Sequence, residues 1–413
     1  MDLTLIVVLV IALALFFDFT NGFHDTANAM ATPIATGAIT PKKAVALAAI
    51  LNLVGAFLST EVAKTISGGI INEDPTTGVQ IMPEMIFAGL MGAVVWNVFT
   101  WLLGLPSSSS HALFGGLVGA AIVGAGFGAI DYGVLLSKVL LPALCAPLIA
   151  GISAYMCTKL AYSITKRQNG VSPKRGGFRY GQIFSSSLVA LAHGTNDAQK
   201  TMGVITLTLV ASGLQTAGTG PHLWVVATCA IAIALGTYTG GWRIIRTMGS
   251  GLTDVKPAQG FAAEVSTASA ILTSSHLGFA LSTTQVASGS VIGSGLGRKG
   301  AEVRWGTAGR IALGWLFTLP AAAIIGGLAA WLTHTGAVGV GIVAVVGVGM
   351  LLLFWYLSRK NHVGHEDTLS DIDNSGAAVN ILSKKERRAR AKADAKAARK
   401  AAQEAMDKEP DNS

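Results

Sequence analysis

The stretch TNGFHDTANAMATPI, residues 20–34, puts His24, Asp25 and Asn28 where an apolar segment of about twenty residues should be completing a membrane crossing. Burying one charged side chain at that depth costs between about 2.5 and more than 10 kcal/mol. A second stretch, AHGTNDAQKTMGVI at 192–205, poses the same problem. Charged side chains inside a membrane mark functional sites by default, so both stretches are predicted to carry function.

The composition is that of a membrane protein. Of the 413 residues, 51% are hydrophobic and 13% are charged, whereas soluble domains carry about 25% charged residues. Apolar runs recur along the chain and reach the roughly 17 to 25 residues that a helix needs to cross a bilayer. Residues 1–17 begin with Asp2 instead of a basic residue, so we expect them to be retained and not cleaved as a signal peptide. We predict an all-α polytopic membrane protein.

The basic residues indicate how the chain is oriented. The net charge is +8, but the Lys and Arg side chains gather in short connections and in the tail, which argues against nucleic acid as a partner. These connections lie at 42–43, 166–179, 243–256, 298–304 and beyond 359. By the positive-inside rule they face the cytoplasm. We therefore expect an integral protein of a bacterial cytoplasmic membrane, with its N-terminus outside and its C-terminus cytoplasmic.

Under these constraints we expect about 10 to 12 transmembrane segments. The expected segments are 3–40, 43–62, 85–103, 105–124, 133–158, 181–212, 222–242, 260–276, 278–296, 306–332 and 337–358. Segments 3–40 and 181–212 are too long for one straight helix and contain polar or glycine residues. We expect interrupted helices or re-entrant pairs there.

The chain divides into four parts. Residues 1–158 form a first transmembrane repeat, 159–180 a cytoplasmic basic loop, and 181–358 a second repeat with one extra span. Residues 359–413 form a cytoplasmic basic tail that is expected to be partly disordered, although its Ala, Lys, Arg and Glu content favours a solvated helix. Contact of its basic cluster with anionic lipid headgroups is the alternative reading.

The two halves of the chain share two motifs. A shift of 172 residues aligns GFHDTANAM (22–30) with GTNDAQKTM (194–202), and a shift of 174 aligns GLPSSSSHALFGGLVG (104–119) with GFALSTTQVASGSVIG (278–293). Each expected half holds an odd number of crossings, so the second half should be inverted relative to the first. Two inverted-topology repeats with interrupted helices are the architecture of secondary transporters.

The first motif predicts a site for a coupling ion. Asp25 and Asp197 occupy matching positions and can meet near the membrane centre, where two carboxylates must bind cations or hold protons. Neighbouring polar side chains can complete the site, namely Asn28, Asn196, His24 and Gln199. Accessory roles stay open for His24, His111, Gln199 and Asp18, the last as a relay or as a partner of His24.

The second motif predicts an anion site. The rows PSSSSH (106–111) and LSTTQ (281–285) directly precede apolar runs, as capping residues do at the start of a helix. Helix N-termini offer free N–H groups and a partial positive charge, and the hydroxyls can also donate. Two such ends that face each other can hold a tetrahedral oxyanion.

These four motifs closely resemble those of the inorganic phosphate transporter (PiT) family. The resemblance rests on GFHDTANA (22–29), GTNDAQKT (194–201), PSSSSHA (106–112) and ALSTTQV (280–286), and it covers roughly residues 1–358. It implies phosphate symport, with Asp25, Asn28, Asp197 and Asn196 at the coupling ion. The phosphate ligands on this reading are Ser108, Ser109, Ser110, Ser282, Thr283, Thr284, Lys200 and Gln285.

One departure from the family bears on the coupling ion. Sodium-coupled members look symmetrical, with Asn in both motif copies, whereas this chain has Asn28 in one and Lys200 in the other. A lysine brings its own positive charge and can replace a bound cation. We therefore favour protons, or co-transport of a metal–phosphate complex, over sodium. No resident cofactor is expected, and any metal ligands stay unassigned.

Other functions stay open at this stage. A sulfate permease of the same fold is the nearest alternative, because phosphate and sulfate are both tetrahedral and differ mainly in the proton that phosphate retains. An intramembrane phosphotransferase using His24 and Asp25 lacks a nucleophile with a nearby base. A passive anion channel would not concentrate its substrate. The chain is therefore predicted not to be an enzyme, and a homodimer is left open.

Overall fold

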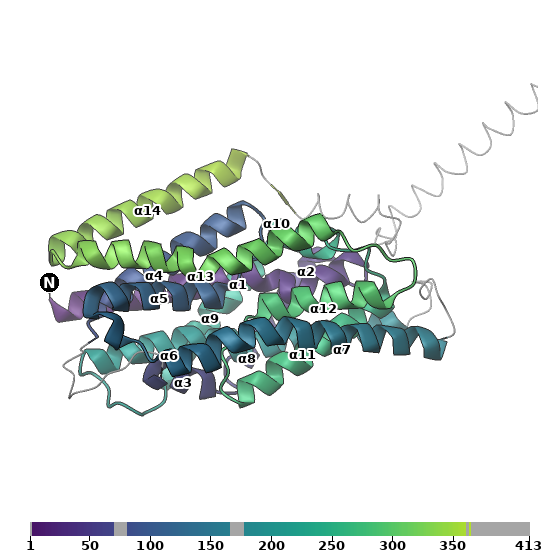
Figure 1. The fold of residues 1–413 in the computed structure, drawn as a ribbon, viewed down its shortest axis with the longest axis horizontal. Helices are drawn as coiled ribbons and strands as arrows, with labels where there is room; N and C mark the ends of the chain where they lie inside the picture. The colour runs from purple at the N-terminus through teal and green to yellow at the C-terminus, as the bar shows by residue number, and fades with distance from the viewer. Residues whose placement is uncertain (1, 70–80, 166–176, 361–362, 365–413) are drawn as a thin grey trace, which may run out of the picture.

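The computed structural model describes residues 2–69, 81–165, 177–360 and 363–364 (Figure 1). The first half of the described chain forms α1 (Leu3–Ala35), α2 (Pro41–Gly55), α3 (Glu61–Gly69), α4 (Pro83–Leu102), α5 (Ser109–Ala125), α6 (Tyr132–Val134) and α7 (Leu141–Thr165). The second half forms α8 (Gly177–Ala211), α9 (Leu223–Thr239), α10 (Trp242–Gly249), α11 (Pro257–His276), α12 (Thr283–Gly297), α13 (Trp305–Thr333) and α14 (Ala337–Lys360).

Every membrane segment expected from the sequence coincides with a helix, but fewer helices qualify as spans by length and composition. In the described ranges five do, namely α1, α4, the segment Tyr132–Ile164, α13 and α14. A sixth is added if α9 and α10, which meet at a bend of 69°, form one span. The helices α2, α5 and α12 have only 15 to 17 residues, and α8 is long but polar. The protein is an all-helical membrane protein, and the number of crossings stays a prediction.

The two segments expected to be interrupted are continuous helices. Both α1 and α8 run unbroken through their polar motifs. The motif side chains bond to side chains of other helices, so the backbone can keep its own helical hydrogen bonds. The chain bends elsewhere, for example at Gly240 between α9 and α10, where φ is +73°, a conformation that glycine adopts without steric cost.

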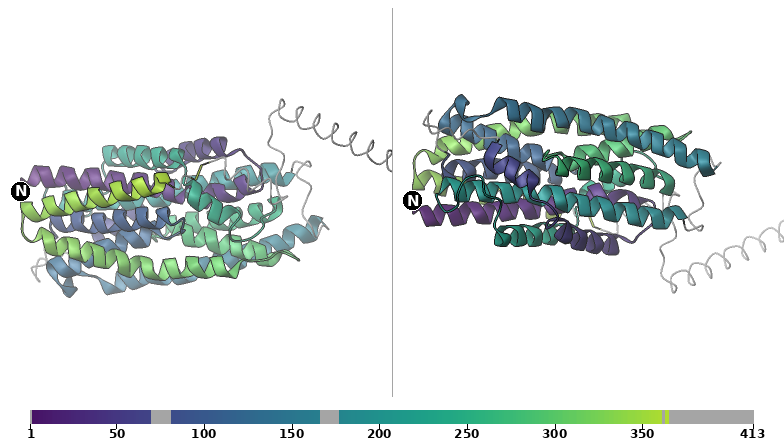
Figure 2. Two further views of the ribbon diagram at one scale, coloured as in Figure 1. Left: turned by 90° about the horizontal axis from the view of Figure 1, so that it is seen from above. Right: turned by 90° about the horizontal axis from the view of Figure 1, so that it is seen from below.

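The order of helices in the first half is repeated in the second. In both halves a long helix that carries an Asp motif comes first, and a shorter helix that starts at a hydroxyl row follows later. The chain runs from the N-terminal end of the molecule along α1, and α7 ends at the opposite end, from which α8 returns (Figures 1 and 2). The four-part division of the chain stays a prediction, and the expected tail falls almost entirely outside the described residues.

The halves exchange packing partners. Helix α1 packs against α9 and α10, while α8 packs against α2 and α3; likewise α5 packs against α13 and α12 against α7. One glycine in each Asp motif lets another helix approach closely. A Cβ on Gly22 would lie 2.3 Å from the carbonyl oxygen of Ile233, and one on Gly194 would lie 2.2 Å from that of Asn52. These glycines are 172 residues apart, so the same backbone contact is made twice.

Candidate functional site

Asp25 lies in the middle of α1 and is held by three side chains. The Nδ1 atom of His24 lies 2.8 Å from its Oδ1. The hydroxyl of Thr284 donates to Oδ1 at 3.0 Å, and that of Ser109 donates to Oδ2 at 3.3 Å. Both hydroxyls belong to the predicted phosphate ligands, and they come from the starts of α12 and α5.

Asp197 lies in the middle of α8 and has two basic neighbours on the same helix. Lys200, three residues on, donates from Nζ to Oδ1, and the Nε2 atom of His193, four residues back, lies 2.8 Å from Oδ2. The Thr283 hydroxyl donates to Oδ2 at 2.9 Å. Residues three and four apart share one face of a helix, so α8 alone supplies this ion-paired cluster.

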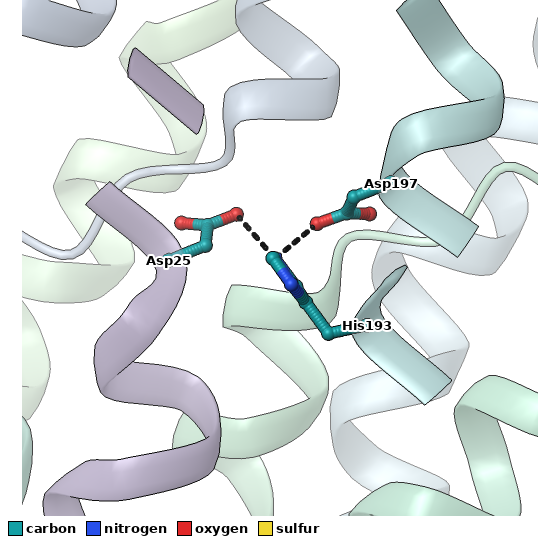
Figure 3. A group of neighbouring side chains, drawn as sticks. All are labelled: Asp25, His193 and Asp197. Carbon is teal, nitrogen blue, oxygen red and sulfur yellow. Dashed lines mark ion pairs between the residues drawn. The ribbon is translucent and has the colours of Figure 1, made fainter. Parts of the chain in front are cut away.

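The two carboxylates lie together, as the repeat predicted. His193 stands between them, with Nε2 3.9 Å from the Oδ2 atom of Asp25 (Figure 3). Thr283 also reaches both, at 2.9 Å to Asp197 and 3.5 Å to Asp25. The Nδ1 atom of His193 faces the Oδ1 atom of Asn52 at 3.2 Å. His193 therefore has an oxygen atom within 3.2 Å of each of its ring nitrogens.

The starts of α5 and α12 converge on these carboxylates. Ser108 and Ser282 cap the two helices by accepting from the backbone N–H of residues 111 and 285, at 3.1 and 3.3 Å. The hydroxyls that follow are free to point into the site, and the positive ends of both helix dipoles stabilise negative charge there. Lys200 joins the two ends, because Nζ donates to the Ser110 hydroxyl at 2.6 Å and to the carbonyl of Leu281 at 2.9 Å.

Asn28 also reaches the site. Its amide Nδ2 donates to the hydroxyls of Thr283 and Thr284 at 3.3 and 3.2 Å, while its Oδ1 has no hydrogen-bond partner among the described residues. The site is closed in this conformation, since no residue of the predicted set is more than 7% exposed.

Several predicted residues lie outside this cluster. His111 and Gln285 contact each other at 3.4 Å and line an apolar groove of about 1070 Å³ between α7, α12 and α13. Asn196 donates to the Ser275 hydroxyl at 2.9 Å. Gln199 accepts from the backbone N–H groups of residues 62 and 63, at 2.8 and 3.2 Å, and so caps the start of α3. Asp18 is buried in α1 next to the cluster but makes no hydrogen bond or ion pair with its members.

Sequence reasoning missed His193 and the polar residues behind His24. His193 stands four residues before Asp197, a helical spacing that would have flagged it. The Nε2 atom of His24 lies 3.3 Å from the Ser107 hydroxyl and 3.5 Å from that of Thr100. The sequence offered no signal for Thr100, which lies inside an apolar helix and is brought near His24 only by tertiary packing.

A second buried polar cluster surrounds Glu264 in α11. The Thr32 hydroxyl of α1 donates to it at 2.7 Å and the Gln182 amide of α8 at 3.1 Å, and the Ser185 hydroxyl also donates to it. A cavity of about 10 Å³, lined by both Glu264 and Asn28, lies between the two polar clusters. That volume holds one water molecule at most.

The main cluster can bind a cation as well as an anion. Asp25, His193 and Asp197 each offer one ligand atom, and these atoms lie within 4.8 Å of one another. In the present geometry two basic side chains, those of His193 and Lys200, already lie beside Asp197. Hydroxyls that donate to carboxylates here can donate to any other oxyanion that takes the carboxylates' place.

Comparison with known proteins bears on this arrangement. Residues 21–326 match the model of the phosphate transporter family. A "Probable low-affinity inorganic phosphate transporter" of Mycobacterium tuberculosis is 53% identical over 379 residues, which is 90% of this chain and 88% of that protein. A protein of the same name from Bacillus subtilis is 41% identical over 330 residues, covering 80% of this chain and 98% of the relative.

A solved structure has the same fold. "The sodium-dependent phosphate transporter" aligns with a TM-score of 0.70 at 23% identity, over 80% of this chain and 99% of that one. The proteins compared here are transporters and not enzymes, in agreement with the motifs. Together the matched residues and the extent of the identity establish that this chain belongs to the phosphate transporter family.

Proposed function

We propose that this protein is a secondary active symporter that imports inorganic phosphate, with protons as the coupling ion. The observation that carries the proposal is the closed cluster in which two carboxylates, a lysine and the hydroxyls of two helix starts converge. Such a cluster supplies donors for an anion and acids for a cation in one site. The names of the relatives point to phosphate as the anion.

The hydrogen bonds suggest how cation and anion are coupled. The hydroxyls of Ser109, Thr283 and Thr284 now donate to Asp25 and Asp197. A phosphate that enters the site can take over these hydroxyls, because its oxygens accept hydrogen bonds as the carboxylates do. A proton bound by a nearby buried acid would offset the negative charge that phosphate adds, so phosphate and proton would enter together.

Lys200 favours protons over sodium. Its ammonium is fully buried and contacts Asp197, Ser110 and the Leu281 carbonyl, which are oxygen ligands of the kind that a sodium ion would need. A fixed positive charge in that place leaves less demand for a second cation. Co-transport of a divalent metal with phosphate is the alternative that the ligand atoms of Asp25, His193 and Asp197 allow.

The exchanged packing suits alternating access. We infer that the two halves are inverted repeats that rock about the site, with the N-terminus outside and the C-terminus in the cytoplasm of a bacterium. The reciprocal contacts of α1 with α9 and of α8 with α2 support this inference. Rigid rocking of one repeat against the other around a central site is a common mechanism of secondary transporters.

Purified protein in proteoliposomes tests the proposal. Labelled phosphate should accumulate against its gradient when an inward proton gradient is imposed without sodium, and excess sulfate should compete weakly. Sodium, pH and divalent metal are varied independently. Uptake that requires sodium and ignores the proton gradient would overturn proton coupling, equal competition by sulfate would overturn phosphate selectivity, and uptake that never concentrates phosphate would indicate a channel.

A further inference from the structure

Asp18 is a buried acid that takes no part in the hydrogen bonds and ion pairs of the site described above. Its side chain is fully buried in α1, and neither carboxyl oxygen has a hydrogen-bond partner among the described residues. The Thr201 hydroxyl of α8, which has no other hydrogen-bond partner, is the one donor that approaches it among the described residues. The Oδ1 atom of Asn21, one turn along α1, is also buried without a partner.

The contrast with the other two acids is direct. Asp25 and Asp197 each receive a hydroxyl and lie beside a basic side chain, so they can remain charged while buried. A carboxylate without hydrogen bonds or a counter-ion is strongly disfavoured in a low-dielectric interior and takes up a proton instead. Asp18 is therefore the acid whose burial requires that it be neutralised.

The charged surroundings of Asp18 do not remove this requirement. Within the described residues, the titratable groups that interact with it are His193, Asp197 and Lys200 on α8 and Cys229 on α9. The basic groups of α8 are already engaged with Asp197, and Cys229 offers no positive charge. Asp18 thus lies next to the ion-paired cluster without belonging to it.

The aligned position in the second half of the chain holds no acid. The residue 172 positions later is Ala190, which is buried in α8 to the same degree. The same helical position can thus be filled by a small apolar side chain. The acid is present in one half only, and that half is the one whose motif has no lysine.

We propose that Asp18 binds the coupling proton. This inference rests on the proposed function of proton-linked phosphate symport. When the site opens outward, the carboxylate gains a proton from external water and an O–H bond forms. When the site opens inward, that bond breaks and the proton leaves to cytoplasmic water, with no change in oxidation state. Phosphate would be held separately, at the hydroxyls between α5 and α12.

The test separates proton movement from phosphate binding. Full-length protein in proteoliposomes is assayed for exchange of labelled phosphate at equal pH, and for net accumulation driven by an inward proton gradient with a pH-sensitive dye inside. In Asp18→Asn, the ratio of accumulation to exchange should fall at least about tenfold, and phosphate should no longer acidify the interior. Asp18→Glu should restore proton movement. Glu61→Gln, on the exposed Glu61–Lys64 pair, is the control.

Each outcome decides a different point. If Asp18→Asn still accumulates phosphate with internal acidification, or loses exchange as well, Asp18 is not the proton site. If the variant abolishes dependence on sodium instead, the site takes sodium and the inference is wrong. If Asp18→Asn does not reach the membrane, Asp18→Ala, the residue of the other half, is subjected to the same two assays. Failure of the wild type to respond to the proton gradient would refute the proposed function itself.

Discussion

The two copies of the Asp motif occupy matching places in the fold but differ in charge. Asp25 and Asp197 are common to both, whereas Asn28 of the first copy corresponds to Lys200 of the second. Asn28 donates to the Thr283 and Thr284 hydroxyls, while Lys200 neutralises the acid on its own helix. Each half of the chain therefore carries one of these acids, and only Asp197 has a lysine beside it.

The histidines of the two copies are exchanged in position. His24 corresponds to Asn196, and Asn21 corresponds to His193. Each half thus has one histidine and one asparagine, but the histidine precedes its acid by one residue in α1 and by four in α8. Only the second arrangement lets an imidazole stand between both carboxylates (Figure 3). The symmetry of the backbone does not extend to the chemistry of the site.

The strongest way to break this comparison is to neutralise the shared acids. We expect Asp25→Asn and Asp197→Asn each to reduce phosphate uptake to background, because each removes a group that binds the coupling cation or organises the hydroxyls. Uptake of labelled phosphate, normalised to the amount of protein in the membrane, measures the effect. Glu61→Gln serves as the control, and normal uptake in both Asp variants would refute the assignment.

Removing the lysine should have the next largest effect. In Lys200→Met, Asp197 loses its ammonium partner, and we expect the free energy of unfolding to fall by about 3 kcal/mol. Proton-driven uptake should fall by about tenfold or more. Lys200→Asn, which copies Asn28, sharpens the comparison because it should bring a dependence on sodium. Thermal unfolding in detergent and uptake with and without sodium check both effects, and an Asn variant with unchanged ion dependence would contradict them.

A second comparison concerns Glu264. Its counterpart 174 positions earlier is Leu90. The three donors to Glu264 also correspond to apolar residues, here at a shift of 172: Thr32 to Val204, Gln182 to Val10 and Ser185 to Leu13. The substitution Glu264→Leu introduces the residue found in the other half and leaves these three buried donors without an acceptor. We expect a loss of about 1 to 3 kcal/mol in the free energy of unfolding.

Glu264→Gln keeps an acceptor oxygen and is the matched control for this change. It should recover most of the lost stability when both variants are unfolded by heat in the same detergent. Equal destabilisation by Leu and Gln would mean that the negative charge, and not the hydrogen bonding, holds the cluster together.

The smallest effect is expected at Gln199. Its amide oxygen caps the start of α3, so Gln199→Ala should cost about 1 kcal/mol of stability. The exchange rate of labelled phosphate should change little, because the side chain does not contact the carboxylate cluster. Phosphate exchange and thermal stability are measured on the same variant. A large loss of phosphate exchange in a stable variant would indicate that Gln199 belongs to the functional site.

Much of the fold could be predicted because its signal lies in long, contiguous patterns. Apolar runs placed at least one helix in each expected segment, and the offsets of 172 and 174 align the two Asp motifs and the two hydroxyl rows. That the halves are inverted repeats stays a prediction. The continuity of α1 and α8 could not be predicted, because it depends on partners such as Thr283 and Thr284 that lie about 250 residues from Asp25. Polar residues inside a span indicate a break only when no distant side chain satisfies them.

Part of the cluster could be predicted in its members but not in its bonds, and the roles of these residues stay predictions. The motifs identified both acids and both hydroxyl rows. They placed the rows at helix starts, but they did not show that Ser108 and Ser282 would be the capping residues, or that Lys200 would span the two helix starts through Ser110 and Leu281. Those contacts arise from the crossing of helices far apart in sequence, which local spacing does not encode.

The close contacts at Gly22 and Gly194 bear on how the chain is made. Helix α1 emerges before α9 during synthesis, because the backbone that it contacts, at Ile233, is translated more than two hundred residues later. Insertion of the first half therefore leaves its polar motif without the helices that will shield it. We expect the acids of α1 to stay at the translocon, or in a partly hydrated intermediate, until the second half of the chain has been inserted.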